Sequence, residues 1–587
     1  MNLTFDILIT SLLVICLVLV LYKNWLKPSL AFVLVVFAFV ILKVISIEDF
    51  LQGLANKQII LIFLLIILTS GIQQNLGKGI FYTLFKKTLS PFQFRFRMML
   101  AVSGLSSMLN NTPVVAFMIP YVKNWSESNG YSASKFLIPL SFATILGGMI
   151  TIVGTSTNLV LNGLIVQSGL PSLNYSDFLF LGGIVTILGL MYLAFFSEKL
   201  LPNTITRKES LLEHLNEYLV ETKVKPSSVL IGKTIEEAGL RHLKDLFLVE
   251  IKRGERSITA VSSDRIIHSE DILFFAGNTQ SILDLINDNN GLELPDTSHL
   301  LSNGFSAMTE AVIPSGSRLV GTSLKELGFR DRYKASVISV YRKGEKVKEN
   351  LGEIQLKEGD LLLLLCSKDF TKVISNRDLI VLSKSGEVQT ELSFTKTLPS
   401  IIAIGVLLIG IFGLIDLFLA AFVGILVMAL SNVINLNQIK SAIDVDLLLI
   451  LVSALAVGMA IQKSGSASFL VQQISGIFAD LNPIGAIIIL FVLTLGLTAL
   501  ITNAAAVSIM FPVAYEMGLR LGENLTPYFI AIAFAASADF MTPIGYQTNL
   551  MVLGPGNYKF SDYTKIGLPL TFIYSSVVIT FIYLYYF

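Results

Sequence analysis

The sequence predicts a polytopic α-helical membrane protein, built from two inverted-topology repeats with a cytoplasmic α+β insert between them. Of the 587 residues, 53% are hydrophobic and only 14% are charged, which is too apolar for one water-soluble globule. The charged residues gather between positions 201 and 395, so that third of the chain is expected to be soluble. Polar motifs in the first apolar part also recur in the second.

Apolar runs mark the predicted membrane spans, since a helix needs roughly 20 such residues to cross a bilayer. They occur near 5–22, 29–46, 58–75, 134–166 and 178–199, and the series returns near 397–413, 416–434, 446–464, 525–553 and 562–586. Two further stretches, about 98–121 and 486–513, are interrupted by polar residues. Because exposed backbone is not tolerated in lipid, we expect these two to be re-entrant hairpins buried in protein.

The two halves match residue by residue. Asn111 to Pro120 recurs as Asn503 to Pro512, and Gly154-Thr155-Ser156-Thr157-Asn158 recurs as Gly545-Tyr546-Gln547-Thr548-Asn549. Each half, 1–200 and 396–587, thus has five spans and one hairpin. An odd number of spans makes the second half enter the membrane from the opposite face, which predicts an inverted repeat.

Basic residues set the predicted orientation, because Lys and Arg are enriched in cytoplasmic loops. They lie in the first loop and before the first hairpin: Lys23, Lys27, Lys78, Lys86, Lys87, Arg95 and Arg97. With these loops inside, the insert is cytoplasmic and both termini lie outside. We therefore expect a multi-pass protein of a bacterial inner (plasma) membrane.

The insert is itself duplicated, as units 207–292 and 300–385. Ile231-Gly232-Lys233-Thr234 recurs as Val320-Gly321-Thr322-Ser323, with a repeat length of about 89 residues. Each unit is expected to contain a short helix and several strands. The expected helices are Ile235 to Leu240 and Leu324 to Leu327, and the strands include Leu246 to Lys252 and Asp360 to Cys366.

These units resemble the C-terminal ligand-binding domain of potassium-transport regulators, called TrkA-C or RCK-C. The resemblance implies domains that pair between subunits, bind a small ligand such as a nucleotide, and regulate the membrane part. The alternative is that they only hold a homodimer together. No Gly-x-Gly-x-x-Gly motif follows a strand, so the dinucleotide-binding neighbour common in those regulators is not expected.

Matched helix breaks mark the predicted binding chamber, since unpaired backbone groups persist at membrane depth only when buried in protein or lining a cavity. Half-helix N-termini at such breaks offer N–H groups to an anion, while freed carbonyls and Asn side chains can coordinate Na⁺. Asn111-Thr112 and Asn503, with Asn158 and Asn549, supply these groups twice. Single Asn and Thr residues usually bond between helices, but this duplication favours function.

The membrane part resembles the divalent anion:sodium symporter family, whose hairpins carry Ser-Asn-Thr and whose broken spans carry Gly-Thr-x-x-Asn. The resemblance implies a Na⁺-coupled elevator, in which the hairpin-bearing part slides against a dimeric scaffold. The implied substrate contacts are Asn110, Asn111, Thr112, Thr155, Ser156, Thr502, Asn503, Gln547 and Thr548. The implied Na⁺ ligands are Ser106, Asn111, Gly154, Asn158, Thr498, Asn503, Gly545 and Asn549.

Two departures from the family pattern bear on the substrate. Asn110 stands where the family has Ser, and the second hairpin reads Thr502-Asn503-Ala504, without the final hydroxyl. With fewer hydroxyls to hold a second carboxylate, sulfate is favoured over a dicarboxylate. Asp539 lies in an otherwise apolar span, where a carboxylate is costly enough to be a functional candidate. It is expected either to take a coupling proton or cation, or to cap a helix break.

The leading hypothesis is secondary active transport of a small divalent anion, driven by Na⁺, by a homodimer in the lipid bilayer. A proton-coupled transporter and a ligand-gated channel or sensor are the alternatives, although no selectivity-filter motif such as Thr-Val-Gly-Tyr-Gly occurs. No enzyme motif occurs in a suitable context, so catalysis is not expected. The chain also lacks the long basic run of a nucleic-acid-binding protein.

Overall fold

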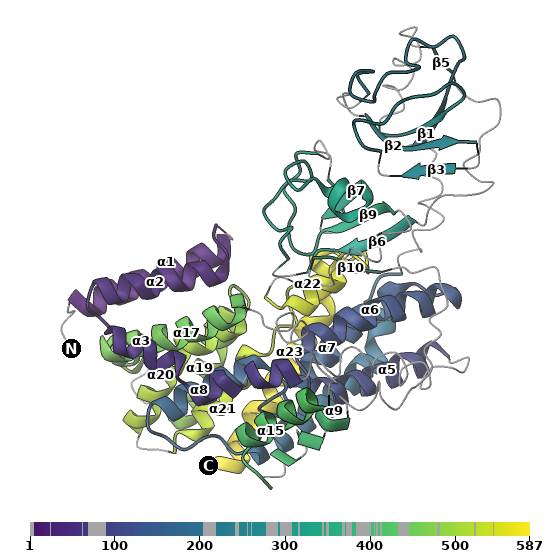
Figure 1. Cartoon of the computed structure of the whole chain (residues 1–587). Coiled ribbons are helices and arrows are strands. Elements are labelled where there is room, and N and C mark those ends of the chain that lie inside the picture. Colours follow the sequence, from purple (N-terminus) through teal and green to yellow (C-terminus); the bar gives the residue numbers. More distant parts are fainter. Residues whose placement is uncertain are drawn as a thin grey trace.

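The computed structural model shows a body of packed helices with two small β-sheets at one end of it (Figure 1). The structure describes residues 5–23, 25–61, 63–68, 90–203, 219–240, 246–254, 256–259, 261–277, 291–293, 308–314, 317–342, 345–347, 352–366, 370, 378–382, 401–403, 405–406, 409–410, 414–431, 445–477, 482–521, 524–543 and 545–587. Part of the predicted span 397–413, part of both insert units, and Lys78, Lys86 and Lys87 lie outside these residues.

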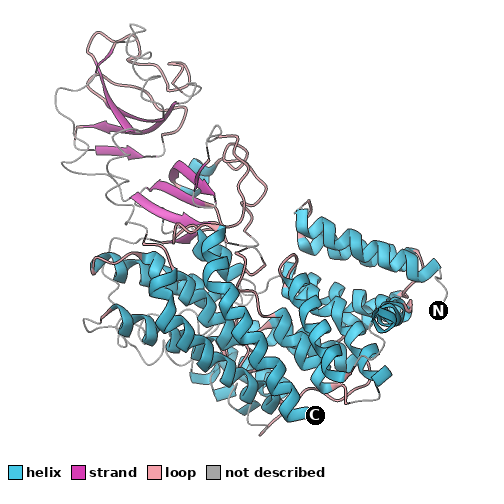
Figure 2. Cartoon of the chain, turned by 180° about the vertical axis from the view of Figure 1, so that it is seen from behind, coloured by secondary structure: helices cyan, strands magenta, loops and turns pink. Residues whose placement is uncertain are grey.

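The helices of the body fall into two series, before and after the sheets. The first series is α1 (Phe5–Lys23), α2 (Pro28–Ile41), α3 (Ile47–Leu54), α5 (Pro91–Ser106), α6 (Asn111–Ser128), η1 (Ala133–Lys135), α7 (Leu137–Gly148), α8 (Ser156–Gln167) and α9 (Tyr175–Leu200). The second is α15 (Leu417–Leu430), α17 (Val445–Lys463), α18 (Ser466–Ile477), α19 (Pro483–Thr498), α20 (Asn503–Leu521), α21 (Thr526–Ala536), α22 (Gln547–Leu553) and α23 (Phe560–Tyr586). The C-terminus lies at the end of the body away from the sheets (Figures 1 and 2).

The first hairpin, α5 and α6, and the second, α19 and α20, begin in the same way. Ser90 and Asn482 each precede a proline and accept a hydrogen bond from the backbone N–H three residues on, at 3.3 Å and 2.7 Å. Such caps satisfy N–H groups that a helix start would otherwise leave unpaired. Both hairpins are longer than the predicted 98–121 and 486–513. Their helices begin at these caps and continue beyond Pro120 and Pro512, the prolines at matching positions of the two halves.

Two predicted spans, 134–166 and 525–553, are each broken into two helices. The first gives α7 and α8, separated by 149–155, and the second gives α21 and α22, separated by 537–546. The half α7 is buried along its whole length, and α21 is buried from Pro527 onward, as broken helices at membrane depth must be.

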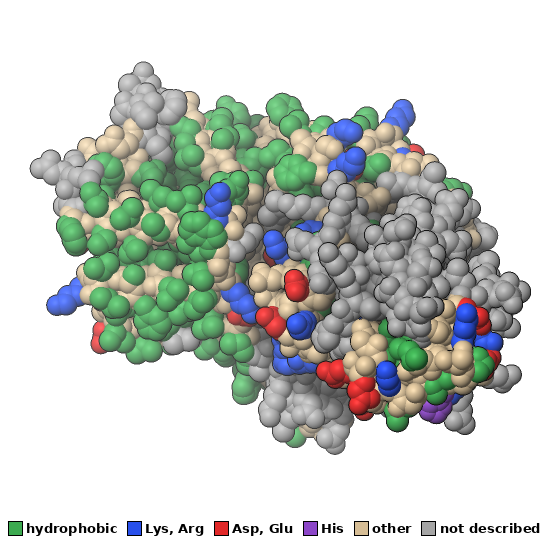
Figure 3. Space-filling view, turned by 90° about the horizontal axis from the view of Figure 1, so that it is seen from above, with side chains coloured by type: hydrophobic (Ala, Val, Ile, Leu, Met, Phe, Trp, Pro, Cys, Tyr) green, Lys and Arg blue, Asp and Glu red, His purple; other side chains and the backbone are tan. Residues whose placement is uncertain are grey.

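The outer surface of the body is apolar. Among the described residues, α1, α9, α20 and α23 are long and apolar enough to cross a membrane, and α17 with α18 passes the same test as a bent pair. On α1 the exposed side chains include Phe5, Leu8, Leu12, Ile15 and Leu19, a stripe that suits contact with lipid. In the space-filling view, hydrophobic side chains are densest over the left part of the face shown, and many charged ones lie toward the lower right (Figure 3).

The sheets form two similar modules. Module 1 contains β1 (Leu219–Val224), β2 (Leu246–Arg253), β3 (Arg256–Thr259), β4 (Ile272–Gly277) and β5 (Leu292–Glu293); module 2 contains β6 (Met308–Val312), α12 (Phe329–Tyr333), β7 (Ala335–Arg342), β8 (Glu345–Lys346), β9 (Leu361–Cys366) and β10 (Ile380–Val381). Their strand orders, β3-β2-β4-β1-β5 and β8-β7-β9-β6-β10, correspond strand for strand. The antiparallel pairing also shifts register at matching places, between Leu248 and Glu250 and between Val337 and Ser339.

The predicted short helices at Ile235 to Leu240 and Leu324 to Leu327 are wrong, because both segments form turns. In module 1 the backbone N–H groups of Ile235 and Glu236 donate to Arg265 and Ser263, across the module, instead of entering a helix. In module 2 the N–H of Lys325 likewise donates to Gly352. The predicted strands at 246–252 and 360–366 are present as β2 and β9.

Module 2 packs on the helical body, whereas module 1 lies farther out (Figure 1). Val312, Leu361 and Leu382 of module 2 belong to the same buried apolar cluster as the helices. The buried side chains of module 1, by contrast, form a cluster of their own. Module 2 is therefore part of the body's packing, whereas the core of module 1 is separate from it.

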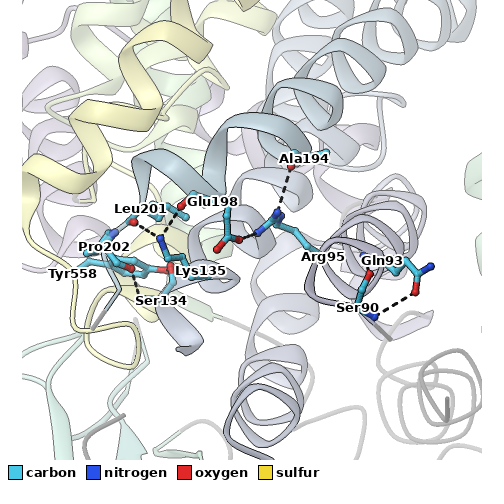
Figure 4. A network of polar contacts seen from close by, with 10 residues as sticks. All are labelled: Ser90, Gln93, Arg95, Ser134, Lys135, Ala194, Glu198, Leu201, Pro202 and Tyr558. Atoms are coloured by element: carbon cyan, nitrogen blue, oxygen red, sulfur yellow. Dashed lines mark hydrogen bonds and ion pairs between the residues drawn. The ribbon is translucent and has the colours of Figure 1, made fainter. Parts of the chain in front are cut away.

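A polar network ties the end of α9, where the chain leaves the body for the insert, to neighbouring helices (Figure 4). The buried Arg95 of α5 forms an ion pair of 2.5 Å with Glu198. Lys135 donates to the carbonyls of Glu198 and Leu201 at 2.7 Å each, and so satisfies groups that the helix end leaves free. The Tyr558 hydroxyl, from the loop before α23, donates to the Ser134 carbonyl. Both halves of the body therefore hold this exit point.

The close packing of α9 on the first helix break can be tested at two adjacent glycines. A Cβ on Gly182 would lie 2.3 Å from the Met149 carbonyl oxygen, whereas one on Gly183 would meet nothing within 4 Å. We expect Gly182→Ala to lower the free energy of unfolding of the detergent-purified protein by about 1–3 kcal/mol through overpacking, and so to lower its melting temperature. Gly183→Ala is the matched control and should be neutral or stabilising. Equal melting temperatures for the two variants would contradict this packing.

Candidate functional site

The tips of the two hairpins are held by the same arrangement of hydrogen bonds. The Ser106 hydroxyl lies within hydrogen-bond distance of the Asn111 side-chain oxygen and, at 2.8 Å, of the Thr144 carbonyl on α7. In the second half, the Thr498 hydroxyl lies 2.7 Å from both the Asn503 side-chain oxygen and the Ala536 carbonyl on α21. Each hydroxyl therefore joins the two arms of a hairpin to a broken helix. We call each such set a hydroxyl–amide unit.

The broken helices also carry matched amides. Asn158 Nδ2 donates to the Thr151 carbonyl at 3.3 Å, and Asn549 Nδ2 donates to the Thr542 carbonyl at 3.2 Å. Both Asn side chains are fully buried. Each therefore bridges the backbone across its own helix break, which satisfies a carbonyl that the break removes from the helix.

The two halves meet where the first hairpin touches the second broken helix. Asn111 Nδ2 donates to the Tyr546 hydroxyl at 2.5 Å, and the Thr112 hydroxyl donates to Gln547 Oε1 at 3.0 Å. On the other side of α22, the buried Ser141 hydroxyl of α7 contacts Thr548 Oγ1 and Asn549 Oδ1 at 2.8 Å and 2.7 Å. Polar side chains from both halves thus converge on the start of α22.

Glycines allow this close approach. A Cβ on Gly148 would lie 2.8 Å from Asn111 Oδ1, and one on Gly154 would lie 2.4 Å from the Gly148 carbonyl oxygen. A Cβ on Gly545 would lie 1.9 Å from Asp539 Oδ2 and 2.6 Å from the Thr498 carbonyl oxygen. Side chains at these positions would displace the oxygen atoms that surround each break.

The oxygen atoms around each break suit a cation such as Na⁺, which unwound carbonyls and polar side chains at helix breaks in a membrane can coordinate. The residues beside each break offer mainly hydroxyl, carbonyl and amide oxygens. Two buried oxygens, Asn158 Oδ1 in the first half and Asp539 Oδ2 in the second, have no hydrogen-bond partner among the described residues. Buried acceptors without a partner are costly, so oxygen-coordinated cations would satisfy them. Ser106, Asn111, Gly154 and Asn158 would hold one ion, and Thr498, Asn503, Gly545 and Asn549 the other.

The structure brings most of the sequence-predicted site residues into these two clusters. Asn111, Thr155, Asn158, Thr498, Asn503, Thr548 and Asn549 are buried there. Asn110 and Gln547 are exposed, and Ser156, Thr112 and Thr502 are partly buried. Sequence reasoning missed Tyr546, Ser141, Thr144, Thr151 and Thr542. Thr151 and Thr542 stand seven residues before Asn158 and Asn549, and this equal spacing is a signal that would have identified them.

Comparison with known proteins agrees with a membrane transporter. A model of the citrate transporter family matches residues 14–523 and, in a second match, residues 407–587. The chain belongs to the citrate transporter family. It is therefore a transporter in the membrane, and not an enzyme. The resemblance of the insert to TrkA-C domains stays a prediction.

Individual relatives cover the chain to different extents. A Chlamydomonas reinhardtii protein described as a sulfur deprivation response regulator is 32% identical over 92% of this chain and 95% of its own length. Sodium/sulfate cotransporter 2 of the same organism is 29% identical over 60% of this chain and 41% of its own length. The solved structure of the Alcanivorax borkumensis YdaH transporter aligns with 99% of this chain and 98% of its own, with 12% identity and a TM-score of 0.44.

The hydrogen bond from Asn111 to the Tyr546 hydroxyl can be tested with the variant Tyr546→Phe. The variant leaves Asn111 Nδ2 without its acceptor, which costs about 1–3 kcal/mol for a buried donor. We expect the apparent KM for the transported solute to rise about tenfold. Tyr192→Phe is the control, since it removes a buried hydroxyl that donates to the Ile566 carbonyl instead. A KM that rises equally in both variants would show that the Tyr546 hydroxyl has no special role at the site.

Proposed function

We propose that this transporter carries a small divalent anion, with sulfate preferred, by symport with Na⁺. The observation that supports this proposal best is the pair of matched hydroxyl–amide units at the hairpin tips. Each unit joins a helix break in one hairpin to a break in a neighbouring helix, and the first unit also contacts the opposite half through Tyr546. Two cation sites beside one chamber would suit Na⁺-coupled uptake of a dianion, because two bound cations would balance its charge.

The anion would bind among the groups between the two units. Donors that face this region include the Thr112 hydroxyl, the Thr155 hydroxyl beside Tyr546, and Asn503 Nδ2, which has no partner among the described residues. The backbone N–H groups at the starts of α6, α8, α20 and α22 add partial positive charge. Ala504 stands in the second hairpin where Thr112 stands in the first, so one side of the chamber lacks a hydroxyl.

A chamber with hydroxyls on one side suits a compact dianion better than a long one with carboxylates at both ends. A similar protein is described as a sodium/sulfate cotransporter, and the matched family is described by citrate transport. We therefore place sulfate first and a di- or tricarboxylate second. Asn110, Ser156, Thr502, Gln547 and Thr548 complete the proposed chamber.

The proposed transport cycle is an elevator between two inverted repeats. The hairpins and broken helices would move together, against a scaffold that includes α2 and α17 of a homodimer. A cavity of about 270 Å³ lies between Gly458 and Met459 of α17 and the site-bearing helices, at Leu164 of α8 and Phe511 of α20. Incomplete packing at this boundary suits relative sliding better than a close-packed interface would. The insert and the basic residues Arg95 and Lys135 would lie on the cytoplasmic side.

The insert would regulate transport through module 2, because this module touches the helices that begin in the site. Lys123 of α6 forms an ion pair with Glu310 of β6, and both side chains are largely buried. A Cβ on Gly359 of module 2 would lie 2.9 Å from Leu550 of α22. Both α6 and α22 start with proposed substrate contacts. A TrkA-C-like domain would bind a small ligand. A ligand that shifts module 2 would therefore act directly on the moving helices.

The main test is uptake into proteoliposomes. With an inward Na⁺ gradient, we expect accumulation of radiolabelled sulfate above that of succinate or citrate. Asn111→Ala and Asn503→Ala should each lower uptake about tenfold or more, since each removes a buried hydrogen-bonding group. Asn129→Ala, on the surface at the end of α6, is the control. Accumulation driven by a proton gradient alone would indicate proton coupling, and passive flux without a gradient would indicate a channel.

The regulatory contact is tested with two glycines of module 2 that share a left-handed backbone. Gly359→Ala would place a methyl group against Leu550, whereas Gly321→Ala would meet nothing within 4 Å, and their φ angles are +78° and +81°. Both variants carry the same backbone strain, but only the first disturbs the contact with α22. We expect Gly359→Ala to raise the maximal uptake rate roughly several-fold, because a restraint on the moving helices is loosened. Equal rates in the two variants would rule out this role.

A further inference from the structure

The break between α21 and α22 contains a buried carboxylate without a positive partner. Asp539 is 3% exposed. One of its oxygens accepts a hydrogen bond of 3.3 Å from Thr542, and the other, Oδ2, has no partner among the described residues. No Lys, Arg or His in the described part of the chain forms an ion pair with it. A buried charge without a partner is strongly unfavourable, so the ionised form of this carboxylate needs a cation beside it.

The unpaired oxygen points into the second hydroxyl–amide unit. Asp539 Oδ2 and the Thr498 carbonyl oxygen both lie within 2.6 Å of the place where a Cβ on Gly545 would be. Thr498 is the residue whose hydroxyl holds Asn503. The backbone carbonyl of Asp539 also accepts a bond of 2.8 Å from Asn549. Asp539 thus lies beside Thr498 and Gly545 and is hydrogen-bonded to Asn549, three of the four proposed ligands of the second cation.

The first half has no such charge. The corresponding place in the sequence carries Gly147 and Gly148, and the Gly148 backbone packs directly against the Asn111 amide. The described ligands of the first proposed cation, Ser106, Asn111, Gly154 and Asn158, are all neutral. The two sites therefore share their hydrogen-bonding plan but differ by one full negative charge.

We propose that Asp539 is an anionic ligand of the second cation site, and that this charge fixes the order of binding. The proposal rests on the proposed Na⁺ symport. One Na⁺ binds at the second site without any anion, because Asp539 supplies the balancing charge. The first site is neutral, so its Na⁺ binds stably only when the divalent anion enters beside it.

The first measurement uses the native full-length protein in detergent. Equilibrium binding of ²²Na⁺ is measured with and without saturating sulfate, with choline chloride keeping the ionic strength constant. The proposal expects about one Na⁺ per chain without sulfate and about two with it. Two Na⁺ ions bound without sulfate, or none bound until sulfate is added, would each overturn the proposed order.

The second measurement compares Asp539→Asn with a matched carboxylate variant. Asp446→Asn removes a carboxylate of α17 that accepts a 2.5 Å hydrogen bond from Ser29, away from the breaks. Thermal stabilisation by Na⁺ without sulfate should need at least about tenfold more Na⁺ in Asp539→Asn, and an unchanged amount in Asp446→Asn. An unchanged Na⁺ requirement in Asp539→Asn would refute the role of Asp539 and leave Na⁺ symport standing.

The outcomes also separate this inference from the proposed function. If native protein neither binds ²²Na⁺ nor shows Na⁺-dependent uptake, the symport itself is wrong. If uptake depends on Na⁺ but the ion binds only together with sulfate, the symport holds and the proposed order of binding is wrong. Should Asp539→Asn fail to fold, the binding stoichiometry of the native protein still decides the question.

Discussion

The structure depends on how buried helix breaks satisfy their backbone groups. A break at membrane depth leaves carbonyl and N–H groups that lipid cannot satisfy, so other parts of the protein must do so. Ser106 and Thr498 solve this problem in the same way, since each hydroxyl reaches both the facing hairpin arm and a carbonyl of the neighbouring broken helix. The hairpin and the broken helix therefore form one unit in each half. Groups that hold the breaks together are also the groups that we propose to face the solute.

The two halves share this framework but differ in the chemistry placed on it. In the first half, the Asn111 amide is satisfied by Tyr546 from the second half. In the second half, Asn503 Nδ2 has no partner among the described residues. Asp539 stands where the first half has glycine. An unpaired donor and a carboxyl group thus lie near the second hairpin, while the Asn111 amide of the first is bonded within the protein.

Much of the framework could be predicted from the sequence, because it follows from local patterns. Apolar runs gave the positions of α1, α9 and α23, and the repeated Asn motifs identified both hairpin tips. The partners Tyr546 and Ser141 could not be found in this way, since they act across the halves and their contacts depend on packing between residues some 400 positions apart. The predicted helix at 235–240 failed for a related reason: its backbone groups bond to 263–267, a distant segment that no local pattern reveals.

The modules show how a duplicated unit can acquire a new contact. Where module 2 has Val312 and Gly359 against the helical body, the corresponding positions of module 1 carry Lys223 and Glu270, which form an ion pair of 2.5 Å in solvent. Glu270 adopts the same left-handed backbone as Gly359, so the turn itself does not demand glycine. Contact with α22 does, because a Cβ there would overlap Leu550. The difference between the modules therefore reflects docking on the site-bearing helices. A module used only as a spacer would have no need to keep an apolar, glycine-containing face toward α22.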